Sequence, residues 1–280
     1  MYIMGAVLCS RIHGIRSVMN RSGEFESLRS ELKSFLLRMT ASVADSEDLL
    51  QDTYLKVHAN IDSFREESSF KTWVFAIAAN LARDLLRAKK RWPENVTDIC
   101  REAALGNPQF FQEAMEIRAV SPQGAFEIKE HIAFCFTCVS KSLPVEQHIS
   151  LWLKEVYGFK VKEIATILDQ TEAMVKYYLH TSRSKMQDIF DHRCSLINKD
   201  GVCHQCTELN GIFNPKQHEQ EELTKIKMAR EAGKVDRQKL FDLRMEVLKE
   251  LDPFESGAAA LQLHHLEHNR QVMERHLEED

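Results

Sequence analysis

Apolar side chains recur at three- and four-residue steps along nearly the whole chain, and few residues interrupt them. Only six prolines and ten glycines are spread over 280 residues. A period of three to four residues is typical of α-helices, and no run alternates as a strand would. The sequence therefore predicts an all-α protein.

Length and composition indicate two small cores rather than one. The chain has 44% hydrophobic and 28% charged side chains over 280 residues, which is enough for a multidomain protein. The longest nearly apolar stretch, WVFAIAANLA, is too short to cross a bilayer. Residues 1–23 lack the basic start and the cleavage site of a signal peptide, so we expect a flexible leader there and a cytoplasmic protein.

Charge is unevenly distributed along the chain. The formal net charge is −5. Residues 207–280 account for it, with 11 lysines and arginines against 16 acidic residues, and the first 206 residues balance to zero. The front of the chain can therefore carry basic faces suited to a polyanion.

The expected helix over residues 70–91 has one polar, cationic side. Phe70, Trp73 and Leu85 belong to its apolar stripe. The opposite side carries Thr72, Asn80, Arg83, Arg87 and Lys90. Cations suit phosphates, an amide suits a base edge, and Trp73 at the border offers a stacking surface for a nucleic-acid strand. The alternative is a merely solvated helix face.

An acidic helix is expected just upstream, over residues 45–64. Its outer surface carries Asp48, Gln51 and Asp52, which lie at i, i+3 and i+4. Residues 44–91 resemble region 2 of the extracytoplasmic-function (ECF) group of bacterial sigma factors. The resemblance is carried by the D-x-x-Q-D helix, a polar loop, an F-x-T-W entry and a basic helix, in that order.

A helix-turn-helix is expected in the second half of the chain. The segment VKEIATIL is followed by DQT and then by a longer helix, with Thr171 as its N-cap. Val175, Leu179 and Met186 line its packing face. With the L-P-x-E-Q opening upstream, residues 140–192 resemble region 4 of the same sigma factors.

The resemblance implies a non-enzymatic initiation factor that binds core RNA polymerase and promoter DNA. It implies a leader (1–23), region 2 (24–92), a linker (93–139), region 4 (140–192) and an extension (193–280). Core polymerase contacts carry over to Asp48, Gln51 and Asp52. Minus 10 contacts carry over to Phe64, Arg65, Trp73, Asn80, Arg83 and Arg87, and minus 35 contacts to Lys176, Tyr177, His180 and Arg183.

Seven cysteines, some of them in C-x-x-C pairs, fit a metal or redox role better than a disulfide framework. Cys135 and Cys138 share one expected helix face, and Cys203 and Cys206 follow region 4. Two such pairs are a common recipe for structural zinc, which would clip the extension to the linker. His131, His192 and Cys194 are reserve ligands. Redox-reactive thiols and inert buried thiols remain alternatives.

The extension is expected to add two or three amphipathic helices, broken at Gly233, Pro253 and Gly257. We expect its histidines 264, 265 and 268 to be solvated. The segment could cover the basic DNA faces through a metal or redox site, or simply stabilise the fold. The sequence leaves open the promoter, the inducing signal and a separate anti-sigma partner.

Two other classes explain less of the chain. A one-component helix-turn-helix regulator would account for residues 140–192, but it leaves the acidic helix and the F-x-T-W block without a role. A cysteine redox enzyme would account for the C-x-x-C pairs, but its motif needs a βαβ context.

Overall fold

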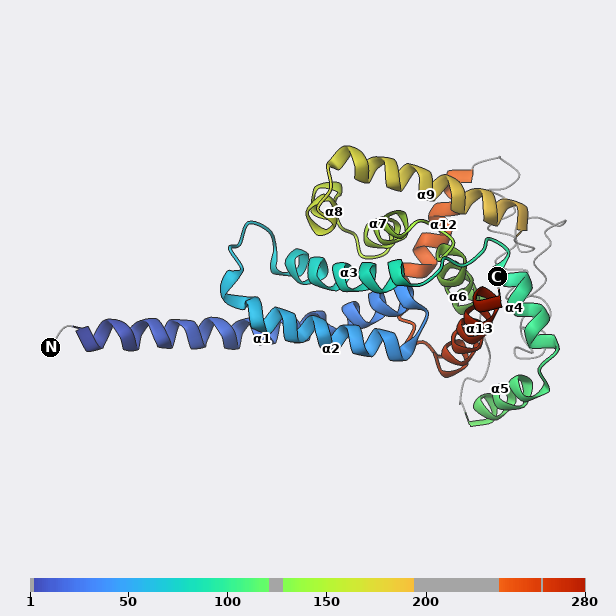
Figure 1. Ribbon diagram of the computed structural model, residues 1–280, viewed down its shortest axis with the longest axis horizontal. Coiled ribbons are helices and arrows are strands. Elements are labelled where there is room, and N and C mark those ends of the chain that lie inside the picture. The colour runs from blue at the N-terminus through green and yellow to red at the C-terminus, as the bar shows by residue number, and fades with distance from the viewer. Residues whose placement is uncertain (1–2, 121–127, 194–236, 258, 280) are drawn as a thin grey trace.

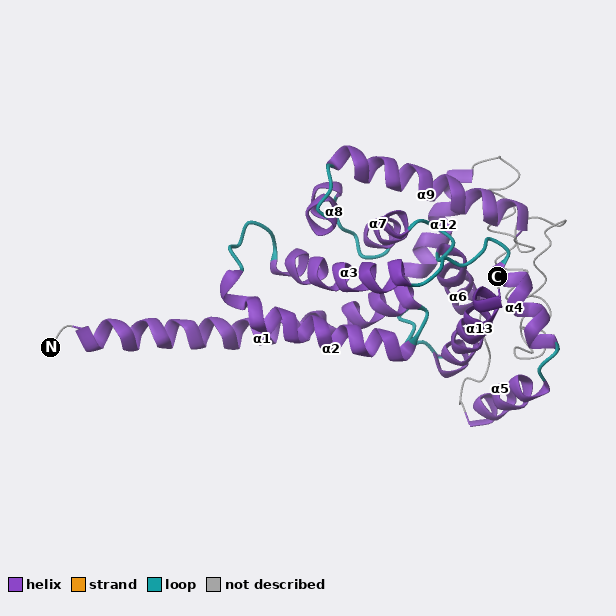
Figure 2. Cartoon of the chain, in the orientation of Figure 1, coloured by secondary structure: helices purple, strands orange, loops and turns teal. Residues whose placement is uncertain are grey.

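The computed structural model describes residues 3–120, 128–193, 237–257 and 259–279. All regular elements in these ranges are helices, which confirms the all-α prediction (Figure 1 and Figure 2). Within the same ranges, no helix has the length and apolar character needed to cross a membrane.

Three helices and one short turn form the N-terminal part: α1 (Ile3–Thr40), α2 (Val43–Asn60), η1 (Ile61–Ser63) and α3 (Phe70–Ala88). Ser42 starts α2 by accepting from the Asp45 amide at 3.1 Å, and Ser69 starts α3 by accepting from the Thr72 amide at 3.1 Å. Since α1 begins at Ile3, residues 3–23 of the segment expected to be a flexible leader are helical.

The linker folds into α4 (Val96–Leu105), α5 (Pro108–Val120) and α6 (Ile128–Ser140). It is followed by α7 (Val145–Glu155), α8 (Val161–Leu168) and α9 (Glu172–Arg193). Asp169 turns the chain between α8 and α9 with a positive φ of 51°, and the Thr171 hydroxyl accepts from the Met174 amide at 3.2 Å. The helix-turn-helix with its predicted N-cap is therefore present.

The extension contributes α12 (Arg237–Glu250) and α13 (Ala259–Glu279). These are two of the helices expected there, and the third expected segment, 220–233, lies outside the described residues. Both helices are amphipathic elements of the main body: α13 packs on α4, α5 and α6, and α12 packs on α6 and α9.

Histidines of α13 correct one expectation. His265 and His268 are only 4% and 8% exposed, and both rings lie against Phe110 of α5, at 5.0 and 4.2 Å between ring centroids. His264 is partly exposed and stacks on the same ring. The prediction that these histidines are solvated is wrong because α5 and α6 bury this side of α13.

The helix α3 occupies the centre of the molecule. It contacts α1 and α2 on one side and α7 and α8 on the other, so the two predicted DNA-reading parts pack directly on each other (Figure 1). Every candidate surface described below therefore belongs to one compact body.

Candidate nucleic-acid interface

An aromatic cluster lies where α3 begins. The rings of Phe64, Phe70 and Trp73 have centroids 5.1 to 5.9 Å apart, and all three are partly exposed. The Arg21 guanidinium of α1 lies 4.5 Å from the Phe64 ring centroid. Arg65 is exposed on the same loop. Partly exposed rings beside cations offer what an unpaired base needs for stacking.

The cations expected on the polar face of α3 are engaged by the second half of the chain. The Arg83 guanidinium donates to the Leu168 carbonyl at 3.3 Å and also bonds the Asn80 amide oxygen. The exposed Arg87 forms an ion pair with Glu146 of α7. Arg83 thus faces the end of α8 and Arg87 faces α7, and of the three residues Asn80 and Arg87 are exposed.

Thr72 corrects the expected helix wheel. Its side chain is 1% exposed, and its hydroxyl lies 2.8 Å from the Ser69 hydroxyl at the start of α3. The buried face of α3 includes Phe75 and Ala82 in addition to Val74 and Ala78. The polar side is therefore narrower than the spacing suggests, because the second half of the chain covers part of α3.

The acidic face of α2 is open. Asp48, Gln51 and Asp52 are all exposed, and Leu55 beside them is 55% exposed. On the opposite side of the same helix, Leu50 and Val57 are buried against α1 and α3. An apolar side chain beside carboxylates is suited to a protein partner that supplies cations.

The second helix of the helix-turn-helix presents polar side chains outward. Val175, Leu179 and Met186 are buried as predicted, while Lys176, Tyr177 and His180 are exposed. Arg183 differs from the expectation because its Nε donates to Glu155 Oε1 at 2.7 Å. The Arg183 side chain is partly exposed but paired with Glu155, so the other three residues are the unpaired exposed side chains of this face that were predicted to contact DNA.

Two cysteines lie beside Asn269 in the interior. The Asn269 amide donates to Cys138 Sγ at 3.7 Å, and Cys100 Sγ donates to the Asn269 carbonyl at 3.9 Å. Burial raises the pKa of the Cys138 thiol to about 12 and also raises that of Cys100. A raised thiol pKa opposes metal binding, because the thiolate is the ligand.

The structure does not support the zinc prediction. The described residues contain no group of three or more histidine, cysteine or acidic side chains that could hold a metal ion. Cys194, Cys203 and Cys206 lie outside those residues. His131 is buried, and burial lowers its pKa to about 4. His192 is exposed at the end of α9, with Nδ1 2.8 Å from the Asp188 carbonyl oxygen.

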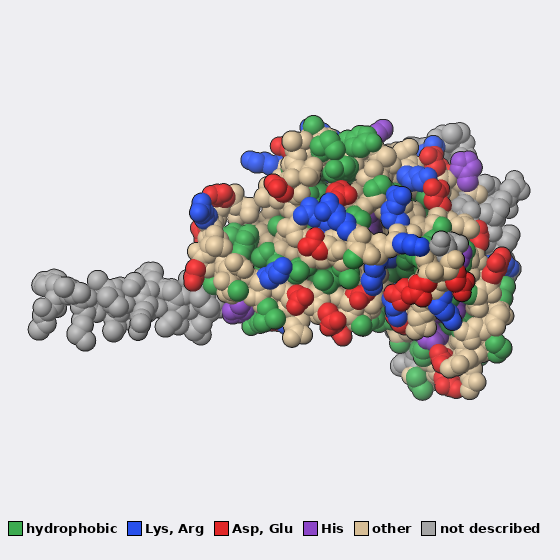
Figure 3. All heavy atoms as spheres, viewed as in Figure 1, with side chains coloured by type: hydrophobic (Ala, Val, Ile, Leu, Met, Phe, Trp, Pro, Cys, Tyr) green, Lys and Arg blue, Asp and Glu red, His purple; other side chains and the backbone are tan. Residues whose placement is uncertain are grey.

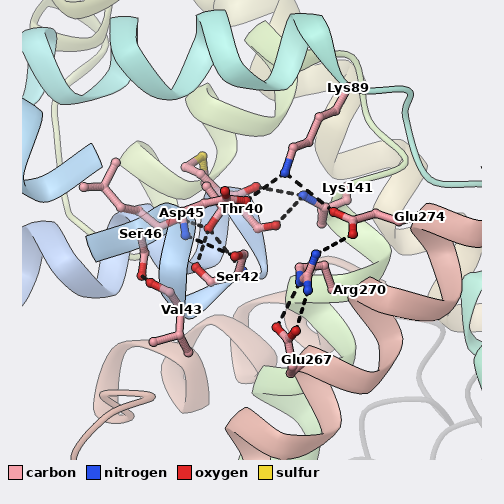
Figure 4. Close-up of polar contacts among 12 residues, drawn as sticks. Thr40, Ser42, Val43, Asp45, Ser46, Lys89, Lys141, Glu267, Arg270 and Glu274 are labelled. Carbon is pink, nitrogen blue, oxygen red and sulfur yellow. Dashed lines mark hydrogen bonds and ion pairs between the residues drawn. The ribbon is translucent and has the colours of Figure 1, made fainter. Parts of the chain in front are cut away.

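A polar network joins the junction of α1 and α2 to the end of α3 and to α13 (Figure 4). The Lys89 ammonium lies between Asp45 at 2.8 Å and Glu274 at 3.7 Å. Arg270 bonds the same Glu274, and the buried Lys141 donates to the carbonyls at the end of α1. A pocket of about 360 Å³ opens here. The pocket lining is net basic: it includes Lys89, Lys90, Arg91, Lys141 and Arg270, against the two carboxylates Glu274 and Glu278.

Charged side chains of both signs lie on the outer surface. Figure 3 shows basic and acidic side chains interspersed on one face of the molecule, with no continuous basic tract on that face.

Sequence reasoning missed the side chains that hold the parts together. Arg38 is 4% exposed and donates to the Leu248 carbonyl of α12 at 3.1 Å. Tyr157 and Phe159 pack against Phe75 of α3. The sequence did contain a clue to this contact, because Arg38 is a cation inside the apolar run FLLRM and a buried cation must find hydrogen-bond acceptors.

Two sequence profiles match the chain. The profile of sigma-70 region 2 matches residues 25–92. The profile of sigma-70 region 4 matches residues 134–186. The first match contains the aromatic cluster and the acidic face of α2, and the second contains the helix-turn-helix.

Curated relatives include several ECF sigma factors. SigG of Mycobacterium tuberculosis is 28% identical over 189 residues, which cover 60% of this chain and 49% of SigG. The sigma-E factor of Haemophilus influenzae is 29% identical over 154 residues, covering 55% of this chain and 78% of the relative. That of Escherichia coli K12 is 26% identical over 144 residues, covering 51% and 73%. The chain thus spans about half the length of SigG.

A solved structure was also aligned. It is the complex of the sigma factor RpoE with the anti-sigma factor NepR from Bartonella quintana. It aligns with a TM-score of 0.43 at 19% identity, covering 61% of this chain and 97% of that one.

Proposed function

We propose that this chain, which carries regions 2 and 4 of the sigma-70 family, works as a sigma factor of the ECF type. It would bind core RNA polymerase in the cytoplasm, direct it to a promoter and help to open the DNA. The observation that supports this most is the presence of both matched segments in one chain, in the family's order.

Core polymerase binding is assigned to the acidic face of α2. Asp48, Gln51 and Asp52 are exposed together on two helical turns. A regulator that binds DNA alone would have no use for this carboxylate surface, which repels phosphates. The exposed Leu55 adds an apolar contact at the edge of the patch.

Minus 10 recognition is assigned to the start and the polar face of α3. Phe64 and Trp73 offer rings to an unpaired base, with Arg65 exposed beside them. Asn80, Arg83 and Arg87 continue along α3. Unstacking a base costs a few kcal/mol, and aromatic stacking with cationic contacts offsets a comparable amount.

Minus 35 recognition is assigned to α9. A helix of this kind enters the major groove near its N-terminal end, where Lys176, Tyr177 and His180 are exposed. His180 and Tyr177 can reach base edges, and Lys176 can reach a phosphate. Arg183 joins this surface only if it leaves Glu155.

None of these assignments needs a cofactor. The zinc clip formed by Cys135, Cys138, Cys203 and Cys206 is a separate proposal about the extension, and it does not affect the sigma factor assignment.

The first prediction tests core polymerase binding. Asp48→Lys should weaken the association with core polymerase by about 10-fold, because it replaces an exposed carboxylate by a cation facing a basic partner. Binding is measured by fluorescence anisotropy, and promoter-directed transcription is measured in a reconstituted assay.

Glu102→Lys is the matched control, because Glu102 is an exposed carboxylate on α4, away from the proposed interface. Thermal unfolding should be unchanged for both variants, since both positions are exposed. If the wild-type chain neither binds core polymerase nor directs transcription, the sigma factor proposal is wrong.

A further inference from the structure

Region 4 covers the cationic side of α3. The Leu168 carbonyl, which accepts from Arg83 at 3.3 Å, lies at the C-terminal end of α8. The Glu146 carboxylate, which pairs with Arg87, lies in the first turn of α7. A helix C-terminus and a carboxylate are both negative, as a phosphate is. In the closed chain, Arg83 and Arg87 are therefore paired with negative groups of region 4 in place of the DNA phosphates that they are proposed to bind.

The contact between the two regions is a buried aromatic core. Tyr157 and Phe159 follow α7 and lie against region 2. The Tyr157 ring is 5.4 Å from the Phe35 ring, and the Phe159 ring is 4.9 Å from the Phe75 ring, between centroids. Phe159 is 3% exposed, and Phe35 and Phe75 are fully buried. Separating the regions would expose these rings to water, so the packed arrangement is a stable state of the free chain.

The helix α12 of the extension is attached to region 2. Arg38 donates to the Leu248 and Leu251 carbonyls at the C-terminal end of α12. Just beyond, Asp252 accepts from the Ser30 hydroxyl at 3.1 Å, and the Lys33 ammonium lies 4.3 Å from the Phe254 ring centroid. These contacts place the extension along α1.

The helix α13 of the extension is attached to region 2 as well. Lys90 donates to the Leu277 carbonyl near the end of α13 at 2.6 Å, and Lys89 pairs with Glu274 (Figure 4). Since α12 also packs on α9, the extension touches region 2, the linker and region 4 at once. The extension therefore connects regions 2 and 4, which must separate before the chain can contact both promoter elements.

The closed body is too small to read both promoter elements. Their names place them about 25 base pairs apart, which is about 85 Å of duplex at about 3.4 Å per base pair. A compact chain of this length has a radius of gyration of about 19 Å and a diameter of about 50 Å. The aromatic cluster of α3 and the exposed face of α9 cannot reach both elements until regions 2 and 4 separate.

We propose that the C-terminal extension is an intramolecular inhibitor that latches regions 2 and 4 together over the cations of α3. This inference rests on the proposed sigma factor function. Promoter recognition and the closed state compete for the same chain, so separating regions 2 and 4 should raise promoter activity at a given protein concentration. The exposed ion pairs of the latch are individually weak, which makes the latch releasable.

Charge reversal at the latch tests the proposal on the full chain. Glu274→Lys, on α13, faces Lys89 and Arg270 with a like charge and tests the contact made by the extension itself. Glu146→Arg, on α7, faces Arg87 with a like charge and tests the contact between regions 2 and 4 that the extension holds closed. We expect each variant to raise the ratio of open to closed molecules by about 5-fold. Because the two contacts are separate, we expect the double variant to approach the product of the two effects.

Each matched control makes the same change of charge at an exposed position that takes no part in the latch. Glu102→Arg on α4 is compared with Glu146→Arg, and Glu279→Lys at the end of α13 is compared with Glu274→Lys; both control positions are exposed. If Glu146→Arg lowers stability, Glu146→Gln removes the pair without repulsion and should open the chain about 2-fold. The charge swap Arg87→Glu with Glu146→Arg should restore closure.

Two independent measurements distinguish failure of the inhibitory role of the extension from failure of the sigma factor function. The distance between spin labels on region 2 and region 4, together with small-angle scattering, reports closure of the free chain without polymerase. The rate of promoter opening with core polymerase reports inhibition.

The proposal is supported if the latch variants lengthen the distance and speed opening while the controls do neither. A wild-type chain in which regions 2 and 4 are already far apart overturns the proposal. So do latch variants that lengthen the distance between the spin labels without speeding promoter opening. If the chain closes as expected but no variant binds core polymerase, the sigma factor function fails, and the inhibitory role fails with it.

Discussion

Cys138 and Cys100 lie on either side of Asn269, and this position decides their chemistry. Both thiols are fully buried, and the cause of their raised pKa values is desolvation of the thiolate, which the Asn269 hydrogen bond and the nearby Lys141 partly oppose at Cys138. Cys135, three residues earlier on α6, is partly exposed. Neighbouring cysteines of one C-x-x-C pair are therefore in different surroundings.

We predict that Cys138 and Cys100 react with a neutral thiol reagent at least about 100-fold more slowly than Cys135, because the thiolate is the reactive form. Mass spectrometry of tryptic peptides after timed labelling measures each site. Labelling in urea is the control, and it should equalise the three rates. Protection of Cys135 and Cys138 together, relieved by a chelator along with release of zinc, would instead favour the zinc clip.

Single residues show which features the sequence could reveal. The exposure of Asp48 and His180 follows from helical spacing alone, and both are exposed. The burial of His265 and Arg38 does not follow from it. Their partners Phe110 and the Leu248 carbonyl belong to distant segments, and local periodicity contains no information about which segments meet.

The helix α9 carries two kinds of contact on one exposed face. Lys176→Ala should weaken binding to all DNA sequences alike and lower the log-log salt slope by about 0.9, because one phosphate contact is lost. His180→Ala should change the preference at one or two minus 35 positions by about 1 kcal/mol while leaving the slope unchanged. Binding titrations at several salt concentrations, on matched and substituted promoters, distinguish the two effects.

Arg183→Ala serves as the contrast within the same helix. Because Arg183 is held by Glu155, its removal should lower stability more than DNA affinity. A salt slope that falls with Arg183→Ala but not with Lys176→Ala would contradict this assignment of roles.

At the scale of elements, the sequence predicted most of the helices but not the surroundings of α3. Ser42, Ser69 and Thr171 cap helices where local sequence indicates it. The polar side of α3 was expected to face solvent or DNA, but Leu168 and Glu146 supply acceptors to it. Amphipathic spacing identifies a face without identifying what covers it.

The whole molecule buries several histidines at the contacts between its parts. His148 joins α7 to the end of α6 through the Ser140 hydroxyl at 3.1 Å. His265 joins α13 to α5 and α6, and His131 is buried on α6. Each ring is neutral in the folded chain because burial disfavours the charged form. Packing between the linker, region 4 and the extension therefore depends on rings that acid would protonate.

This dependence predicts acid sensitivity near neutral pH. Burial lowers the pKa of His131 to about 4 and those of His148 and His265 to about 3, from the usual 6.5. Below pH 6.5 the unfolded chain takes up protons that the folded chain excludes. The free energy of unfolding should therefore fall as the pH drops from 6.5 towards 4, by up to about 1.4 kcal/mol per pH unit for each histidine.

Urea unfolding at pH 7.5, 6.5, 5.5 and 4.5 measures this dependence. His265→Leu should flatten the slope by about a quarter to a third, because His131, His148 and His268, whose pKa burial also lowers, still contribute. His180→Ala should leave the slope unchanged, because its ring is exposed. Carboxylates add to the loss mainly below about pH 4.5, so the interval from 6.5 to 5 reports the histidines. A flat free energy over that interval would mean that these rings are not buried in the folded chain, and that the linker, region 4 and the extension do not pack as one body.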